Sequence, residues 1–150
     1  MGLNSAMIQK HEMTADFEKL TYDATMLKDA WKGALDSATL LVNSKWTSYH
    51  ILNFINWIID GSPYSSLFFP GFSLGKLLIS KPINGKLNYQ QTLAISYDNQ
   101  SDLFTLQYSD WDLIDSKDDF EKAIQWVVKC PGADLGRHFL EFLQWKDNWN

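Results

Sequence analysis

The chain has 150 residues, of which 45% are apolar and 21% are charged, and this composition excludes a wholly disordered protein and allows one domain with a substantial core. Its formal net charge is −5 and Arg137 is its only arginine, which argues against nucleic-acid binding, because neutralised phosphates supply most of that affinity. The longest apolar run, Ile51 to Ile59, is far shorter than the ~20 residues of a membrane span. Since Cys130 is also the only cysteine, we expect a cytoplasmic protein with no disulfide and no membrane partner.

The N-terminal part of the chain is predicted to be helical after a short start without hydrophobic periodicity. We expect residues 1–12 to be disordered or a remnant of cloning, and residues 13–150 to form a single domain. Between residues 14 and 42, apolar side chains recur at steps of three and four, which predicts an amphipathic helix. The sequence leaves open whether this helix is interrupted near Thr21. A second helix is predicted over residues 47–60, and the Gly and Pro that follow are expected to end it.

The pattern then changes from helical to alternating. Residues 62–73 are predicted to form a loop because of their proline, glycine and serine content. The sequence favours aromatic rings tucked under this loop over an exposed recognition patch, and it leaves both open. The pair Asn84-Gly85 predicts a hairpin turn between two strands in the segment 75–98. Pro82 cannot donate a hydrogen bond to a neighbouring strand, so the first of these strands is expected at an edge of the sheet.

A second turn, from Asn99 to Asp102, predicts a third strand and the register of its pairing. A four-residue turn here brings three pairs of large side chains to one face, whereas a slip of one residue would scatter them. The predicted pairs are Tyr97 with Phe104, Ile95 with Leu106, and Leu93 with Tyr108.

Two more helices are predicted after the strands. Ser116 and Asp119 form a start similar to a capping box, apolar residues then recur with helical spacing as far as Val128, and Pro-Gly follows Cys130. A last helix is predicted from Asp134. The sequence therefore predicts an α+β fold, in which an antiparallel meander of three or more strands carries two N-terminal and two C-terminal helices on one face.

The segment from Ser109 to Trp126, SDWDLIDSKDDFEKAIQW, holds six carboxylates beside two lysines. A calcium loop requires a glycine at its sharp turn and ligands at fixed offsets, but this segment contains no glycine, and Ile114 stands at the fifth position from Asp110, where a ligand is expected. A catalytic pair of carboxylates requires one of them to be buried, and nothing in the sequence marks an acid here as buried. We therefore predict neither a metal site nor a catalytic site in this segment.

Helix formation explains only part of this charge. A helix dipole stabilises acids in its first turns by ~0.3–1 kcal/mol each, which accounts for the last three acids of the segment. The others repel one another, but such a field can speed encounters with a basic protein by ~10–10³, and a central tryptophan suits the role of anchor. The predicted partner-binding residues are Asp98, Asp102, Asp110, Trp111, Asp112, Asp115, Asp118, Asp119 and Glu121.

The other residues with chemical potential form no recognisable motif. His11, His50 and His138 lack the spacing of metal ligands, and the sequence favours packing or surface roles for them. Cys130 is predicted to be a buried thiol rather than a nucleophile. Because phosphate-binding glycine loops and catalytic serine motifs are also missing from the sequence, we predict that the protein is not an enzyme and uses no cofactor.

The leading hypothesis is a small acidic module that docks onto or masks a basic protein, such as a toxin or a nuclease. Bacterial immunity proteins offer an analogy of charge and size alone. One alternative is an enzyme or small-molecule binder with an aromatic-lined pocket, and another is a subunit of a larger assembly or a dimer. The sequence leaves the partner, any ligand and the oligomeric state open. The candidate polar groups of the pocket are Tyr89, Tyr97, Tyr108 and His138.

Overall fold

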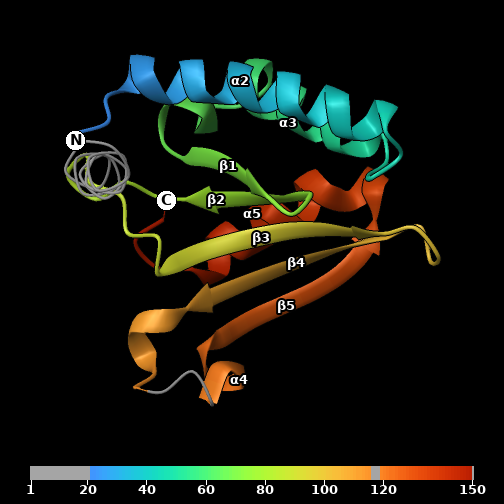
Figure 1. Cartoon of the computed structure of the whole chain (residues 1–150). Helices are drawn as coiled ribbons and strands as arrows, with labels where there is room; N and C mark the ends of the chain where they lie inside the picture. Colours follow the sequence, from blue (N-terminus) through green and yellow to red (C-terminus); the bar gives the residue numbers. More distant parts are fainter. Residues whose placement is uncertain (1–20, 116–118, 150) are drawn as a thin grey trace, which may run out of the picture.

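The computed structural model of the chain describes residues 21–115 and 119–149 (Figure 1). The predicted N-terminal segment 1–12 and any helix before Thr21 lie outside the described residues. The helices and strands are α2 (Ala24–Asn43), α3 (His50–Asp60), β1 (Phe69–Ser73), β2 (Lys76–Ser80), β3 (Gln91–Asp98), β4 (Leu103–Asp110), α4 (Phe120–Ala123), β5 (Ile124–Pro131) and α5 (Leu135–Trp145). Short 3₁₀ turns are η1 (Tyr64–Ser66), η2 (Trp111–Leu113) and η4 (Gly132–Asp134).

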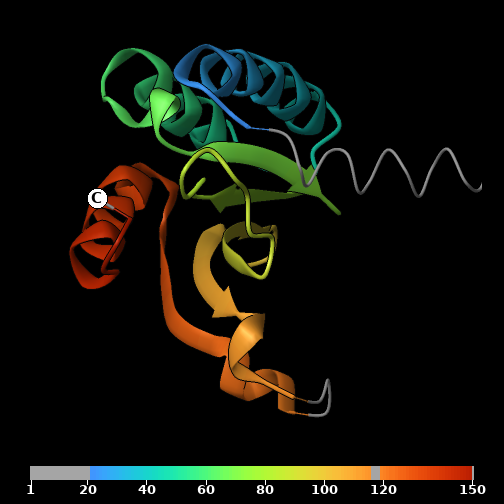
Figure 2. The same ribbon diagram turned by 90° about the vertical axis from the view of Figure 1, so that its left-hand side faces the viewer.

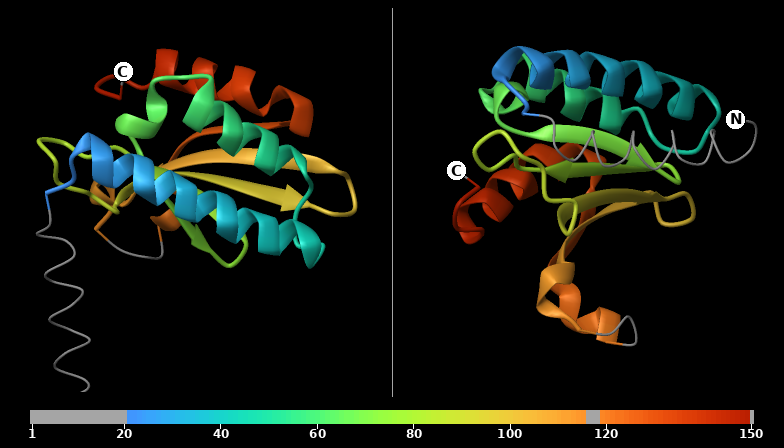
Figure 3. Two further views of the ribbon diagram at one scale, coloured as in Figure 1. Left: turned by 90° about the horizontal axis from the view of Figure 1, so that it is seen from above. Right: turned by 60° about the vertical axis from the view of Figure 1, so that its left-hand side comes forward.

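The five strands form one antiparallel sheet in the order β1-β2-β3-β4-β5. The long helices α2 and α3 lie above β1 and β2, and α5 lies against β4 and β5 (Figures 1 and 2). Seen from above, α3 lies between α2 and α5 (Figure 3). The predicted α+β class and the meander are thus confirmed, and the meander has five strands.

The core forms between the helices and one face of the sheet. Along β3 and β4, the buried side chains are alternate residues, as expected when a single face of a strand is covered. The predicted pairing of these two strands is confirmed. The turn between the strands and their large side chains favour the same register. Tyr97 pairs with Phe104, Ile95 with Leu106, and Leu93 with Tyr108.

Aromatic rings fill much of the space between the sheet and the helices. The Trp31 indole of α2 is fully buried and donates a hydrogen bond to the Phe68 carbonyl over 2.9 Å. Phe139 of α5 contacts the rings of Phe54, Tyr64 and Phe68. The rings of residues 64–72 are therefore mostly part of the main core, which ties this segment to both α2 and α5.

The prediction of a loop over residues 62–73 was wrong, because η1 and β1 lie in it. β1 pairs with β2 along its whole length, so β2 is not an edge strand, and the prediction that it lies at an edge was wrong. Pro82 follows the end of β2, and the edge strands contain Pro70 in β1 and Pro131 at the end of β5. The rule for proline holds, but it applies to a different strand.

The prediction of a long helix ending near Val128 was also wrong. Among the described residues of this segment, 119–131, Phe120–Ala123 form an α-helix of one turn, and the next eight residues form β5. Ile124, Trp126 and Val128 alternate with more exposed residues and pair with β4, so the same apolar positions satisfied both a helical and a strand period. The adjacent β-branched residues Val127 and Val128 favour the strand.

The predicted turn at Asn84-Gly85 is confirmed, but the hairpin around it is minimal. Asn84 and Gly85 have φ values of 54° and 78°, and Ile83 and Lys86 exchange two backbone hydrogen bonds of 2.8 and 3.0 Å. Beyond this bridge the chain leaves the strand pairing, since β2 ends at Ser80 and β3 begins at Gln91. The turn instead holds the start of the described chain, because the Gly85 carbonyl accepts a hydrogen bond from the Tyr22 backbone N–H.

In the described part of the chain, each helix is too short or too polar to cross a bilayer.

Candidate functional site

The predicted acidic surface is divided between the two ends of β4. Asp98 and Asp102 lie in the turn between β3 and β4, whereas Asp110 ends β4 and begins the segment that leads to β5. At ~3.3 Å per residue, the eight residues of β4 separate these groups by about 25 Å. We name residues 98–103 the acidic turn, and the described residues 110–115 and 119–123 the acidic tip.

The acidic tip projects from the rest of the molecule. It includes η2 and α4, which contact each other and extend below the sheet, away from α2 and α3 (Figure 2). Asp110, Trp111, Asp112, Asp115, Asp119 and Glu121 all lie in it, and the predicted site residue Asp118 lies outside the described residues. The structure thus brings together six of the nine predicted residues.

Two carboxylates of the acidic tip hold its backbone in place. Asp110 accepts a hydrogen bond from the Asp112 backbone N–H at 3.0 Å and another from the Gln91 side chain at 3.3 Å. Asp112 accepts one from the Asn88 side chain at 2.9 Å. These bonds fix the start of the tip to the connection between β2 and β3.

The remaining carboxylates of the tip are solvent-exposed. Asp119 forms only a long ion pair with Lys122, at 3.8 Å. Within the described residues, no hydrogen bond or ion pair joins Asp115 or Glu121 to another side chain, and both are exposed. The predicted support from a helix dipole is small for Asp119 and Glu121, because α4 is one turn long.

Large apolar side chains lie exposed among these acids. Trp111 is 39% exposed, Phe120 50% and Leu113 59%. Exposed carboxylates beside poorly buried rings contribute little to folding, since little of the charge or of the apolar area gains a partner within the described residues. This combination is typical of a surface that is covered by another molecule.

The acidic turn has a different structure. Asp98 accepts hydrogen bonds from the Ser101 hydroxyl and the Gln100 backbone N–H, at 2.8 and 3.1 Å. These two bonds lower the pKa of Asp98 below its ordinary value. Asp102 has a φ of 56° and accepts a hydrogen bond of 2.6 Å from the Tyr97 hydroxyl, which raises the pKa of that tyrosine. Both carboxylates therefore serve the turn itself.

The chemical alternatives find little support in the described residues. No three His, Cys, Asp or Glu side chains there are grouped as a metal site requires. Burial raises the pKa of the Cys130 thiol to about 11, with a smaller contribution from Asp134, so the reactive thiolate is disfavoured. His138 contacts Glu141 at 2.9 Å, and His50 packs against Gly132, whereas His11 lies outside the described residues.

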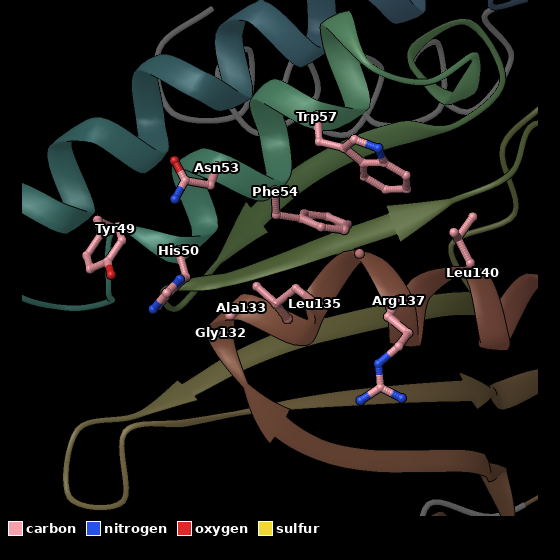
Figure 4. A pocket seen from close by; sticks show the side chains of 11 residues that line it. Tyr49, His50, Asn53, Phe54, Trp57, Gly132, Ala133, Leu135, Arg137 and Leu140 are labelled. Carbon is pink, nitrogen blue, oxygen red and sulfur yellow. The ribbon is translucent and has the colours of Figure 1, made fainter.

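A groove with a volume of about 600 Å³ lies between α3 and the start of α5 (Figure 4). Its floor is apolar, with Phe54, Trp57 and Leu135, and its rim includes Asn53 and Arg137. None of the polar groups predicted for a pocket lines it. Tyr108 in particular is buried in the core, and this burial raises its pKa to about 12.

A third exposed feature was not predicted from the sequence. Leu74 is 93% exposed in the tight turn between β1 and β2, and its φ of 52° belongs to the left-handed region that leucine rarely adopts. Trp46, which is 65% exposed, lies against this turn, since a Cβ atom on Gly75 would be 3.9 Å from the indole. The sequence offers no periodic signal for this corner, because it joins two loops that are far apart in the chain.

Comparison of the chain with models of known protein families, with curated proteins and with solved structures found no significant match.

Proposed function

We propose that this protein is a binding module that docks onto a basic protein partner through its acidic tip. The observation that carries the proposal is the exposure of Trp111, Leu113 and Phe120 within one projecting element that also carries exposed carboxylates. Large rings of this kind dominate the energetics of many interfaces, and the surrounding charges steer a partner of opposite charge.

The tip is suited to this role because its base is already ordered. The Trp111 backbone N–H donates to the Gln90 carbonyl over 2.9 Å, and Asp110 and Asp112 are held as described above. A surface held in place before binding loses less conformational entropy when the complex forms. The acidic turn lacks exposed rings, and in this proposal it adds only to the long-range field.

The partner that fits this surface is a protein with a cationic patch around an apolar depression. Trp111 would fill the depression, and Asp115, Asp119 and Glu121 would face lysine or arginine side chains. A nuclease or a toxin with a cationic active site has this chemistry, and in that case the module would mask the active site. The proposal also retains the cytoplasmic location expected from the sequence.

The proposal is tested by quantitative affinity capture from the organism that makes the protein, at low and high salt. The tip variant is Asp115→Asn with Glu121→Gln, and its matched control is Asp29→Asn with Asp36→Asn on the exposed side of α2. Each pair removes two of the negative charges that contribute to the net −5. We expect the wild-type protein to capture a partner at low salt. This partner should be lost at high salt and with the tip variant, and it should be retained with the control variant.

Equal loss with both variants would show that only net charge matters, and binding that is indifferent to salt and to both variants would contradict the proposal. The captured protein is then purified and titrated directly with each variant.

A second candidate function is small-molecule binding in the groove between α3 and α5, favoured by its volume and by the aromatic side chains Phe54 and Trp57. A thermal-shift screen of metabolites, nucleotides and sugars tests it, with Gly136→Leu as the variant that fills the groove. Gly136 lies against Trp57, and an added Cβ atom would make ordinary contact with the indole at 3.8 Å, so Gly136→Ala is the matched control. A flat response over all three classes would contradict this candidate.

A further inference from the structure

The two edge strands of the sheet differ in how they are protected. β1 has five residues, contains Pro70 and packs closely against α2. β5 has eight residues, and its only proline is Pro131, the last of them. Figure 1 shows β5 as the outermost strand, with α4 only at its start and no helix along its outer edge. The pairing with β4 shifts by one residue at Gln125, and it is regular from Trp126 onward. This regular part of an open edge is a template for pairing with a further strand.

The backbone of β5 has hydrogen-bonding capacity that the chain does not use. In an antiparallel sheet, alternate residues of an edge strand direct their N–H and C=O groups outward. From Gln125 to Pro131, no such group bonds to any described residue outside the pairing with β4. Apolar surface accompanies this edge, because Val127 is 50% exposed on the open face and Trp145 of α5, which contacts the Trp126 ring, is 46% exposed.

We propose that two copies of this chain pair through β5 in an antiparallel manner, about a two-fold axis at Val127, so that their sheets become continuous. Directly opposed residues in this register share a face of the sheet. Val127 then faces its own copy, and Trp126 faces Val128, which is a favourable cross-strand pair of an aromatic and a β-branched residue.

Charge disfavours a register centred on Lys129. Lys129 is the only charged residue of β5, and with the axis at Val127 it lies opposite the start of the partner's β5, where no like charge opposes it. An axis at Lys129 would oppose the two lysines directly, which is destabilising. The proposed register pairs Trp126 with Val128 within the regular part of β5, and it leaves Pro131, which has no N–H to donate, outside the ladder.

The experiment measures solution mass by sedimentation equilibrium over a range of concentrations, at high salt so that contacts through the acidic tip are screened. We expect the wild-type chain to form a dimer, and Val127→Lys and Val127→Glu, each alone, to weaken it by about tenfold or more, because like charges oppose each other at the axis. An equimolar mixture of the two variants is expected to regain the dimer, since residue 127 then faces the opposite charge. This recovery also shows that both variants are folded.

Gln107 provides the control, since it faces Val127 from the neighbouring strand β4 and lies inside the sheet. Gln107→Glu and Gln107→Lys are expected to leave the dimer unchanged. A wild-type chain that stays monomeric at every concentration would overturn the proposal, as would a dimer that tolerates both Val127 variants. A mixture of the Val127 variants that remains monomeric would equally overturn it.

Discussion

The acidic turn and the acidic tip carry the same kind of charge at opposite ends of β4, but the turn uses both of its acids within the fold, whereas the tip also carries acids that form no such contacts in the described chain. In the turn, Asp98 and Asp102 accept hydrogen bonds from neighbouring groups, and Asp102 also adopts a left-handed conformation that aspartate tolerates. In the tip, Asp115 and Glu121 have no such bonds within the described chain, and exposed rings surround them. A cluster of acids in a sequence therefore indicates a contact surface only where the carboxylates are not already used locally.

The largest expected effect is on binding at the tip. We predict that Trp111→Ala weakens binding to the captured partner by about 30-fold or more, the loss of roughly 2 kcal/mol that is typical of an aromatic anchor. Its free energy of unfolding should change by less than about 0.5 kcal/mol, because exposed residues contribute little to stability. Calorimetric titration and urea unfolding measure the two quantities. A large loss of stability with unchanged affinity would mean that Trp111 serves the fold, as the acids of the turn do.

The turn should show the opposite behaviour. We predict that Asp102→Ala lowers the free energy of unfolding by about 1–2 kcal/mol, since alanine tolerates the left-handed conformation poorly and leaves the Tyr97 hydroxyl without its acceptor. Asp102→Asn retains both properties and serves as the control, while Asp115→Asn in the tip should be neutral. If Asp102→Ala and Asp115→Asn have equal effects on urea unfolding, the proposed distinction between turn and tip fails.

Leu74, in the turn between β1 and β2, provides a third test of whether an exposed side chain contributes to the fold. Its backbone conformation is strained for leucine, and its side chain is almost fully exposed, so the fold gains nothing from it. We predict that Leu74→Asn raises the free energy of unfolding by about 1 kcal/mol, because asparagine is favoured in such turns. Urea unfolding provides the measurement, and Leu113→Asn, at an exposed position without this strain, is the control. A destabilised Leu74→Asn protein would show that the leucine packs within the chain.

The smallest expected effect concerns pH. The folded state lowers the pKa of Asp98 from its ordinary value of 3.8, so the stabilisation is present above pH 3.8 and is lost as the pH falls towards the lower folded pKa. We predict that Asp98→Asn has a flatter dependence of stability on pH in this acidic range than the wild-type chain. Urea unfolding at a series of pH values compares the two curves, and identical curves for wild type and Asp98→Asn would contradict a role for this carboxylate in the turn.

Local sequence was sufficient for several elements of this fold. The apolar stripes of α2, α3 and α5, the Asn84-Gly85 turn and the pairing of β3 with β4 were all predicted, because each depends on periodicity or turn chemistry within a short segment. The six residues of the tip lie within twelve positions of one another, so their grouping also followed from the sequence. Their exposure and the projection of the tip did not, since these depend on what the rest of the chain covers.

The tertiary structure decided the features for which local signals were ambiguous or absent. Residues 124–131 fit both a helix and a strand, and β5 formed because the edge of β4 offered hydrogen bonds from Leu103 to Ser109. β1 formed in a proline-containing segment because β2 and α2 provided partners for its backbone and its rings. Three further features depend on how separate parts of the chain pack together. They are the placement of the acids in turn and tip, the groove between α3 and α5, and the contact of the turn at Leu74 with Trp46. A sequence pattern records the preferences of a segment, whereas the neighbours that satisfy them are fixed only when the whole chain packs.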